Sequence, residues 1–282
     1  MVLRSTLLGA LLLLEACATS GTPQVIYLAR HGQTGYNRVG RFQGDPDLDS
    51  VGYVNRVSLW NLLREKPIGA VYTSEKLRTR KTAELVARQH NLPIQTRAAL
   101  NEIHGGVLEG ICVSQMAPER ARPSDRECEV RSRGARIEPV LPLLQKIHRE
   151  GSQDRIEGKF PLAESVGDVS RRVATFVEEL RRGFAGREVL VVGHGVVNRV
   201  MLHHLMGWPL ESVLSLRQEN DQVYRLETDG DKVVRLSLYS PGQGWRECQS
   251  SPSSETRRLD CHPPDREHRH GTPATAPASR PR

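Results

Sequence analysis

Three short apolar runs give the first indication of the fold. Residues 24–29 read Gln-Val-Ile-Tyr-Leu-Ala and lead into Arg-His-Gly, and residues 188–192 read Glu-Val-Leu-Val-Val and lead into Gly-His-Gly. A third run, residues 70–74, reads Ala-Val-Tyr-Thr-Ser. Continuous apolar runs of this length, rich in β-branched residues, are typical of strands buried on both faces. The pattern therefore predicts interior strands, two of which deliver a histidine to the loop that follows.

Apolar residues at helical spacing separate these strands. The spacing predicts helices at residues 55–64, about 75–90, near 140–149, 164–182 and 196–206. Alternating strands and helices favour an α/β fold, and we expect a three-layer sandwich in which helices cover both faces of a mostly parallel central sheet. Reactive groups in such sheets collect at the carboxyl ends of strands, and His31 and His194 fall at these ends.

Two segments depart from the alternation. Residues 117–136 are polar and rich in arginine and contain Pro118 and Pro123, so we expect a surface excursion over or beside the site. Residues 241–282 are dominated by Ser, Pro, Arg and His, with few large apolar side chains to bury. The sequence therefore predicts a folded domain at 24–240 and a disordered tail at 241–282.

The first residues have the features of an export signal. Arg4 precedes an apolar run at 7–14 that is too short to cross a bilayer. The run ends in Leu-Glu-Ala-Cys17, which resembles the lipobox of bacterial lipoproteins, although Glu15 departs from the usual small or apolar residue. In that motif the cysteine is acylated and becomes the new N-terminus.

The sequence therefore predicts a signal peptide at 1–17 and a short linker at 18–23. Its Cys17 would carry the lipid that anchors an exported chain to a membrane of the cell envelope. A periplasmic or secreted chain without the anchor is the alternative.

The other cysteines are Cys112, Cys128, Cys248 and Cys261. An exported chain enters a compartment where disulfides persist, and four cysteines allow three pairings. Pairing of sequence neighbours is the simplest of these. The local sequence offers no evident basic partner that would activate a cysteine nucleophile, so we expect these residues to be structural or incidental.

The chain carries a formal net charge of +7. An excess of cations favours anionic ligands such as phosphate esters, and equally acidic membranes or nucleic acid. Aromatic residues make up only 5% of the chain, and its arginines are spread out instead of lining one helix. This distribution argues against a nucleic-acid partner.

Four distant segments supply the groups that phosphoryl transfer needs. They are Arg30-His31-Gly32-Gln33-Thr34, Arg78, Glu102 and His194-Gly195. A neutral imidazole can attack phosphorus when guanidinium groups neutralise the phosphoryl oxygens and a carboxylic acid protonates the departing alcohol.

These segments and their neighbours resemble, in order, the motifs of the histidine phosphatase superfamily, which contains phosphoglycerate mutases and many acid and sugar phosphatases. The remaining matches are Asn37, Arg41-Phe42-Gln43-Gly44 with Asp47 and Gly52, Tyr72-Thr73-Ser74 with Thr82 and Ala83, Leu100-Asn101-Glu102-Ile103-His104 with Glu109-Gly110, and Glu164-Ser165 with Asp168 and Arg172. The resemblance covers about residues 24–238 and implies the phosphoglycerate mutase-like fold.

The resemblance also implies a role for each site residue. His31 would be the nucleophile, kept unprotonated by Arg30 and Arg78. These arginines and His194 would hold the nonbridging phosphoryl oxygens, and Glu102 would be the general acid and base. The other expected substrate-binding residues are Asn37, Gln43, Gly44 and Gly195. The mechanism calls for no metal or other cofactor.

Some polar residues compete for these roles. Glu109 lies in the same loop as Glu102, and we favour Glu102 because it aligns with the family acid. We expect His203 and His204 to serve packing or to lie at the surface. The tail histidines have no paired ligand spacing, so they predict at most adventitious metal binding; they are His262, His268 and His270.

The combined prediction is a lipid-anchored phosphomonoesterase acting on a small phosphorylated substrate. Gln33-Thr34 follows Arg-His-Gly, as in the phosphatase branches that this chain resembles, whereas glycolytic mutases typically have Glu-Ser. A phosphoglycerate mutase-type transferase is the alternative, and a phosphate-binding lipoprotein without catalysis is a third. The sequence specifies neither the substrate nor the oligomeric state, because specificity in this fold comes from variable loops.

Overall fold

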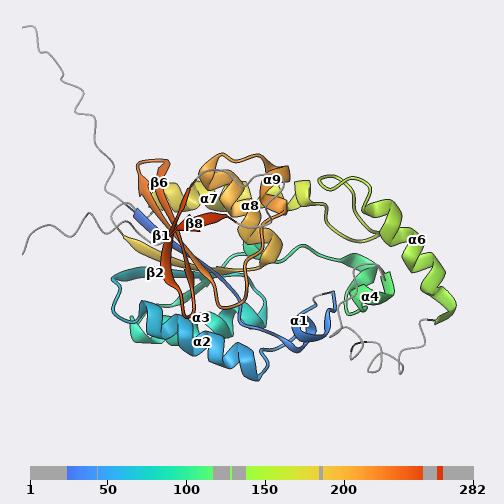
Figure 1. Ribbon diagram of the computed structural model, residues 1–282, viewed down its shortest axis with the longest axis horizontal. Coiled ribbons are helices and arrows are strands. Elements are labelled where there is room, and N and C mark those ends of the chain that lie inside the picture. The colour runs from blue at the N-terminus through green and yellow to red at the C-terminus, as the bar shows by residue number, and fades with distance from the viewer. Residues whose placement is uncertain are drawn as a thin grey trace, which may run out of the picture.

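The computed structural model describes residues 24–42, 44–116, 128, 138–183, 187–249 and 259–262. Within them, one eight-stranded sheet carries helices on both faces (Figure 1), which confirms the predicted α/β sandwich. The strands are β1 (Gln24–Arg30), β2 (Ile68–Thr73), β3 (Ile94–Thr96), β4 (Glu188–Gly193), β5 (Val223–Asp229), β6 (Lys232–Ser240), β7 (Gly244–Gln249) and β8 (Asp260–His262).

All the predicted helices are present. The helices are α1 (Gly35–Val39), α2 (Ser50–Leu63), α3 (Leu77–Gln89), α4 (Val113–Met116), α6 (Leu141–Gly151), α7 (Val166–Gly183), α8 (Gly195–Met206) and α9 (Leu210–Leu214), with short 3-10 turns η1 (Ala98–Leu100), η2 (Gly106–Leu108) and η5 (Glu138–Val140). None of the described helices is long and apolar enough to cross a membrane. The predicted signal and linker, residues 1–23, lie outside the described residues.

The sheet has a parallel half and an antiparallel half. Its strand order is β3-β2-β4-β1-β5-β6-β7-β8. The first four strands in that order pair in parallel, and every pairing from β1–β5 onward is antiparallel. The prediction of a mostly parallel sheet is therefore correct only for the half that carries the histidines. Short connections join β5, β6 and β7, and connections of that length allow only antiparallel neighbours.

Alternate residues of β1 face different helical layers. Ile26 and Leu28 belong to the core beneath α7 and α8, whereas Tyr27 and Ala29 belong to the core over α2 and α3. All four side chains are buried. A strand covered on both faces is mostly apolar, which explains why residues 25–29 read as a continuous apolar run.

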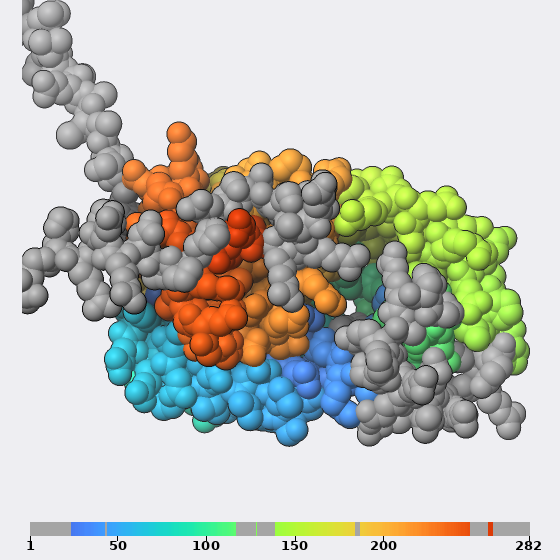
Figure 2. Space-filling model, in the orientation of Figure 1, coloured from blue at the N-terminus to red at the C-terminus, as the bar shows by residue number. Residues whose placement is uncertain are grey.

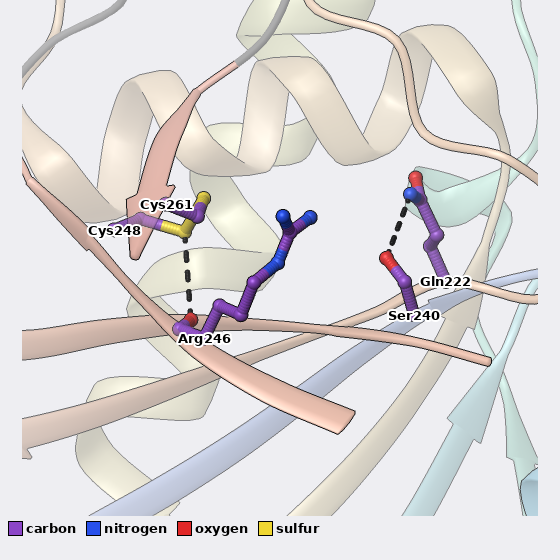
Figure 3. Close-up of a disulfide and its surroundings, with 5 residues drawn as sticks. All are labelled: Gln222, Ser240, Arg246, Cys248 and Cys261. Atoms are coloured by element: carbon purple, nitrogen blue, oxygen red, sulfur yellow. Dashed lines mark hydrogen bonds between the residues drawn. A yellow bond between two sulfur atoms is a disulfide. The ribbon is translucent and has the colours of Figure 1, made fainter. Parts of the chain in front are cut away.

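The prediction of a disordered tail at 241–282 is wrong for its first residues. Here β7 extends the sheet, and β8 pairs with it so that Cys248 lies opposite Cys261 and forms a disulfide with it (Figure 3). Trp245 packs against Tyr239, with ring centroids 5.5 Å apart. Composition underestimates this segment because backbone pairing along a sheet edge and a covalent crosslink stabilise it without many apolar side chains. Residues 250–258 and 263–282 lie outside the described residues.

The chain between η2 and α7 forms a helical cap at one end of the sheet, which contains α4 and α6. Its α6 (yellow-green in Figures 1 and 2) projects from the body of the molecule. His148 on α6 stacks on Phe160 at 5.6 Å between ring centroids, and Phe160 meets Phe42 edge to face. Cys112 forms a disulfide with Cys128. Pairing of sequence neighbours is therefore confirmed for both disulfides, while the rest of the predicted excursion at 117–136 lies outside the described residues.

Candidate active site

Two buried imidazoles meet at the carboxyl ends of β1 and β4. These strands are neighbours, and their register pairs Arg30 with Gly193, so the next residue of each strand is His31 or His194. The ring centroids lie 5.1 Å apart, and both side chains are at most 1% exposed. Burial, followed by the charges of Arg78 and Arg30, holds the pKa of His31 well below 6.5. Burial and then Arg78 lower the pKa of His194 in the same way, so both rings are neutral at pH 7.

A backbone contact fixes which nitrogen of His31 carries the proton. Its Nδ1 lies 2.8 Å from the carbonyl oxygen of Gly32. A carbonyl oxygen can only accept, so Nδ1 carries the proton of the neutral ring and Nε2 keeps its lone pair.

Arg30 and Arg78 place guanidinium groups beside the imidazoles. Arg30 ends β1 and donates from Nη1 to the carbonyl oxygen of Gln218 at 2.8 Å. Arg78 is fully buried in the first turn of α3 and donates from Nη1 to the carbonyl oxygen of Gly44 at 2.7 Å. Their remaining buried nitrogens, Arg30 Nε, Arg78 Nε and Arg78 Nη2, meet no acceptor in the described part of the chain. Buried charged donors of this kind are suited to an anion.

Glu102 is the carboxylate that most strongly influences the two guanidinium groups. It accepts hydrogen bonds from the backbone nitrogens of Ile103, at 3.1 Å, and Val196, at 3.3 Å. Its charge is the largest ionic influence on Arg30 and Arg78, where it opposes the lowering of the pKa by burial. Glu109 affects the pKa of Arg78 less than Glu102 does, and it accepts a hydrogen bond from the backbone nitrogen of Gly105 at 3.2 Å. This arrangement favours Glu102 over Glu109.

Ser74 is a site residue to which the sequence analysis gave no role. It follows β2, the other parallel neighbour of β4, and its Oγ lies 2.8 Å from Nε2 of His194. The same oxygen bonds to Thr79 Oγ1 at 2.8 Å. These contacts fix the ring of His194. The position of Ser74 at a strand end was the signal that could have identified it.

The loop between α9 and β5 also supports the site, and the sequence analysis missed it. Gln218 donates through Nε2 to the carbonyl oxygen of Leu28 and accepts through Oε1 from Asn198. Asn220 donates to the carbonyl oxygen of His31 at 2.7 Å. No periodicity marks this polar loop, so it became evident only from the structure.

The loop after β1 packs against α2 backbone to backbone. A Cβ on Gly52 would lie 2.1 Å from the carbonyl oxygen of Gln33, and a Cβ on Gly32 would lie 2.6 Å from the carbonyl oxygen of Gly52. Contact this close excludes any side chain at either glycine. The two glycines therefore set how closely the loop that carries His31 approaches α2.

The other residues of the predicted motifs near the site have varied surroundings. Asn37 uses its Oδ1 to accept from the backbone nitrogen and hydroxyl of Thr34, at the start of α1. Its role as a phosphate donor stays a prediction. Gln33 donates to Asp49, which begins α2, and Gln43 lies outside the described residues. Gly195 lies beside Arg30, with its Cβ position 3.8 Å from Arg30 Cζ.

A cleft of about 220 Å³ opens beside Arg78 and Glu102. Residues that line it include Gly44, Lys76, Arg78, Asn101, Glu102, His104, Glu109, Glu164 and Arg172. Arg78 and Glu102 therefore face the same cleft. The described residues contain no group of three or more His, Cys, Asp or Glu side chains able to hold a metal ion.

The remaining histidines of α8 do not join the site. His203 Nδ1 contacts the carbonyl oxygen of Trp208 at 2.5 Å, and His204 Nε2 contacts that of Ser170 at 3.0 Å. Both serve packing between elements, as the sequence predicts. The tail residues His268 and His270 lie outside the described residues, and the structure describes only the backbone of His262.

Neutral imidazoles beside buried cations and one acid, at the carboxyl edge of a parallel sheet, are groups suited to bind an anion. A model of the histidine phosphatase superfamily (branch 1) matches residues 26–153 and 134–240. The chain belongs to this superfamily, which confirms the predicted family and the prediction of an enzyme of the histidine phosphatase class.

Several known proteins are similar to this chain. "Probable phosphoglycerate mutase GpmB" of Shigella boydii serotype 18 is 26% identical over 204 residues, which cover 72% of this chain and 84% of that protein. YhfR of Bacillus stearothermophilus is 26% identical with a TM-score of 0.57, covering 74% of this chain and 94% of that one. Mycobacterial glucosyl-3-phosphoglycerate phosphatase is 21% identical with a TM-score of 0.57, covering 82% and 100%, a likeness that concerns the fold.

Proposed function

We propose that this protein is a phosphomonoesterase that acts through a phosphohistidine on His31 and uses no metal ion. One observation carries the proposal: a neutral buried imidazole lies among buried guanidinium nitrogens that have no acceptor. That arrangement supplies a nucleophile and a preorganised environment for phosphoryl charge at the same point.

In the first step, Nε2 of His31 attacks phosphorus and the bond to the ester oxygen breaks. Glu102, as the carboxylic acid, gives its proton to the leaving oxygen. In the second step, the Glu102 carboxylate takes a proton from water, the water oxygen attacks phosphorus, and the nitrogen–phosphorus bond breaks. Proton transfer of this kind contributes about 10²- to 10⁴-fold in rate.

The cations act on the charge of the phosphoryl group. Arg30 and Arg78 donate to its nonbridging oxygens, where the transition state spreads negative charge. Ser74 donates its hydroxyl proton to Nε2 of His194, so that Nδ1 of this ring carries a proton and serves as another donor. The buried Nδ1 of His194 has no partner among the described residues, which supports this role.

The test is hydrolysis of p-nitrophenyl phosphate by the full chain in detergent with EDTA, beside His31→Ala. We expect metal-independent turnover that the substitution abolishes, and a phosphoryl adduct on the wild-type protein that is labile in acid. Absence of turnover from acidic to neutral pH would contradict the proposal and favour a binding protein that only resembles an enzyme.

A phosphoglycerate mutase-type activity is the second candidate, because one relative bears that name. Incubation with 3-phosphoglycerate separates the two activities. Release of inorganic phosphate supports the phosphatase, whereas formation of 2-phosphoglycerate without release supports the mutase.

We further propose that the chain is exported and anchored in a membrane of the cell envelope through an acylated Cys17. The signal-like pattern of residues 1–17 supports this location, and the two disulfides suit an oxidising compartment. Labelling of bacteria that express the chain with radioactive palmitate should mark the wild type and not Cys17→Ala. An unlabelled wild-type chain released from the envelope would instead support plain secretion.

A further inference from the structure

Most charged or amide side chains lining the cleft already have partners. Arg172 makes a two-pronged contact with Glu164, at 2.8 and 2.9 Å, and donates to the carbonyl oxygen of Ala99. Asn101 uses both ends of its carboxamide on Glu75. These groups are therefore engaged within the protein, and a substrate would have to displace existing bonds to use them.

Lys76 is different. It lines the cleft beside Arg78 and Glu102, and its ammonium group has no carboxylate within ion-pair distance in the described part of the chain. The neighbouring carboxylate of Glu75 is taken by Asn101. Lys76 is half-buried, so its charge is only partly screened by solvent.

The backbone of Lys76 is fixed by the site itself. Its nitrogen donates to Ser74 Oγ at 3.1 Å, the same oxygen that contacts His194, and its carbonyl oxygen accepts from Thr79 at 2.8 Å. Its charge reaches the imidazole of His194 and contributes, as the smallest of the causes, to lowering the pKa of that ring. The backbone that carries this cation is therefore fixed beside Ser74 and His194.

We propose that Lys76 binds a second anionic group carried by the alcohol portion of the substrate. Glu102, which protonates the leaving oxygen in the proposed function, lines the same cleft as Lys76. The part of a substrate that reaches Lys76 is therefore the leaving alcohol, whereas the transferred phosphoryl group lies among Arg30, Arg78 and the imidazoles. The preferred substrates are phosphate monoesters whose alcohol bears a carboxylate or a second phosphate near the scissile bond.

This inference rests on the proposed function and is tested with three achiral esters of one carbon length. The esters are 3-hydroxypropyl phosphate, 3-phosphooxypropanoate and propane-1,3-diol bisphosphate, which differ only in the distal group. The full chain is compared as wild type, Lys76→Met and Lys76→Arg, and kcat/KM for phosphate release is measured for each. Arg80→Met is the matched control, because Arg80 is an exposed cation in the first turn of α3, just after Lys76, and does not line the cleft.

We expect Lys76→Met to lower kcat/KM about 10-fold for the esters with a distal anion and to leave 3-hydroxypropyl phosphate nearly unchanged, since one charge-assisted contact is lost. Lys76→Arg should retain the preference and Arg80→Met should match the wild type. The more strongly affected of the two anionic esters distinguishes carboxylate from phosphate recognition. Equal losses on all three esters would overturn the inference while the phosphatase stands, and no hydrolysis of any ester by the wild type would overturn both.

Discussion

The neutral state of the two buried imidazoles predicts an acid-sensitive fold. In the unfolded chain His31 and His194 titrate near the ordinary value of 6.5, whereas burial and the neighbouring arginines hold their folded-state pKa well below it. Well above pH 6.5 neither state binds these protons, and the contribution of the neutral rings to stability is fully present. As the pH falls through 6.5, the unfolded chain binds protons at these imidazoles and the folded protein does not. The free energy of unfolding therefore decreases.

The size of this effect follows from the number of protons. Each imidazole contributes a slope of at most about 1.4 kcal/mol per pH unit. Integrated from pH 6.5 to 5.5, the limit is about 1 kcal/mol for each ring and about 2 kcal/mol for both. Carboxylates with ordinary pKa values near 4 hardly titrate over this interval, so the imidazoles dominate it.

Urea unfolding followed by circular dichroism at pH 7.5, 6.5 and 5.5 measures the effect, in phosphate-free buffers of constant ionic strength. His31→Gln combined with His194→Gln should remove most of the slope between pH 6.5 and 5.5. The matched control His90→Gln, outside the site, should keep it. Equal slopes in the wild type and the double variant would refute the claim that the rings are neutral and buried together.

Three further predictions concern the site. Glu102→Gln should lower kcat about 10²- to 10⁴-fold for alkyl phosphates and much less for p-nitrophenyl phosphate, whose leaving group needs little protonation; equal losses would exclude the acid role. Ser74→Ala should lower kcat about 10-fold with a small change in KM, because His194 loses the bond that orients it, and an unchanged kcat would make Ser74 merely structural. Gly52→Ala should unfold at lower urea than the wild type and lose activity, because its Cβ would lie 2.1 Å from a backbone oxygen, whereas Gly35→Ala has open space and should be nearly neutral; similar behaviour of the two variants would contradict the close approach.

The sequence could predict the parallel half of the sheet because each strand there is buried on both faces. Residues 25–29 and 189–192 are apolar at every position and belong to, or pack against, the cores beneath α7 and α8 and over α2 and α3, and a continuous apolar run is a strong signal. The ends of those runs then placed His31 and His194 side by side.

The antiparallel half gave no such signal. β6 exposes several of its residues, and β7 is held by strand pairing and by the disulfide between Cys248 and Cys261, so neither reads as a buried strand. Amino-acid composition does not show whether a segment pairs with a neighbouring strand or forms a disulfide. The predicted end of the folded domain, residue 240, therefore came before the actual end.

Within the site, predictability depended on residue type. Guanidinium and imidazole groups have few uses other than charge and proton transfer in a buried loop, so Arg30, Arg78 and the histidines could be identified from the sequence. Ser74 and Gln218 act by hydrogen bonds that any polar residue in a loop could make, and only the fold shows which atoms they reach.

The position of β1 has a consequence for how the chain acquires its fold. Both neighbours of β1 lie late in the chain, since Val25 pairs with Glu188 on one side and with Glu227 on the other. Pairings between residues so distant in sequence must close a long loop of chain, and they form slowly. β1 therefore lacks its β4 neighbour until residues up to 193 are available, and it lacks its β5 neighbour until residues up to 229 are available. We therefore expect chains that end before β4 to leave β1 unpaired and to aggregate readily.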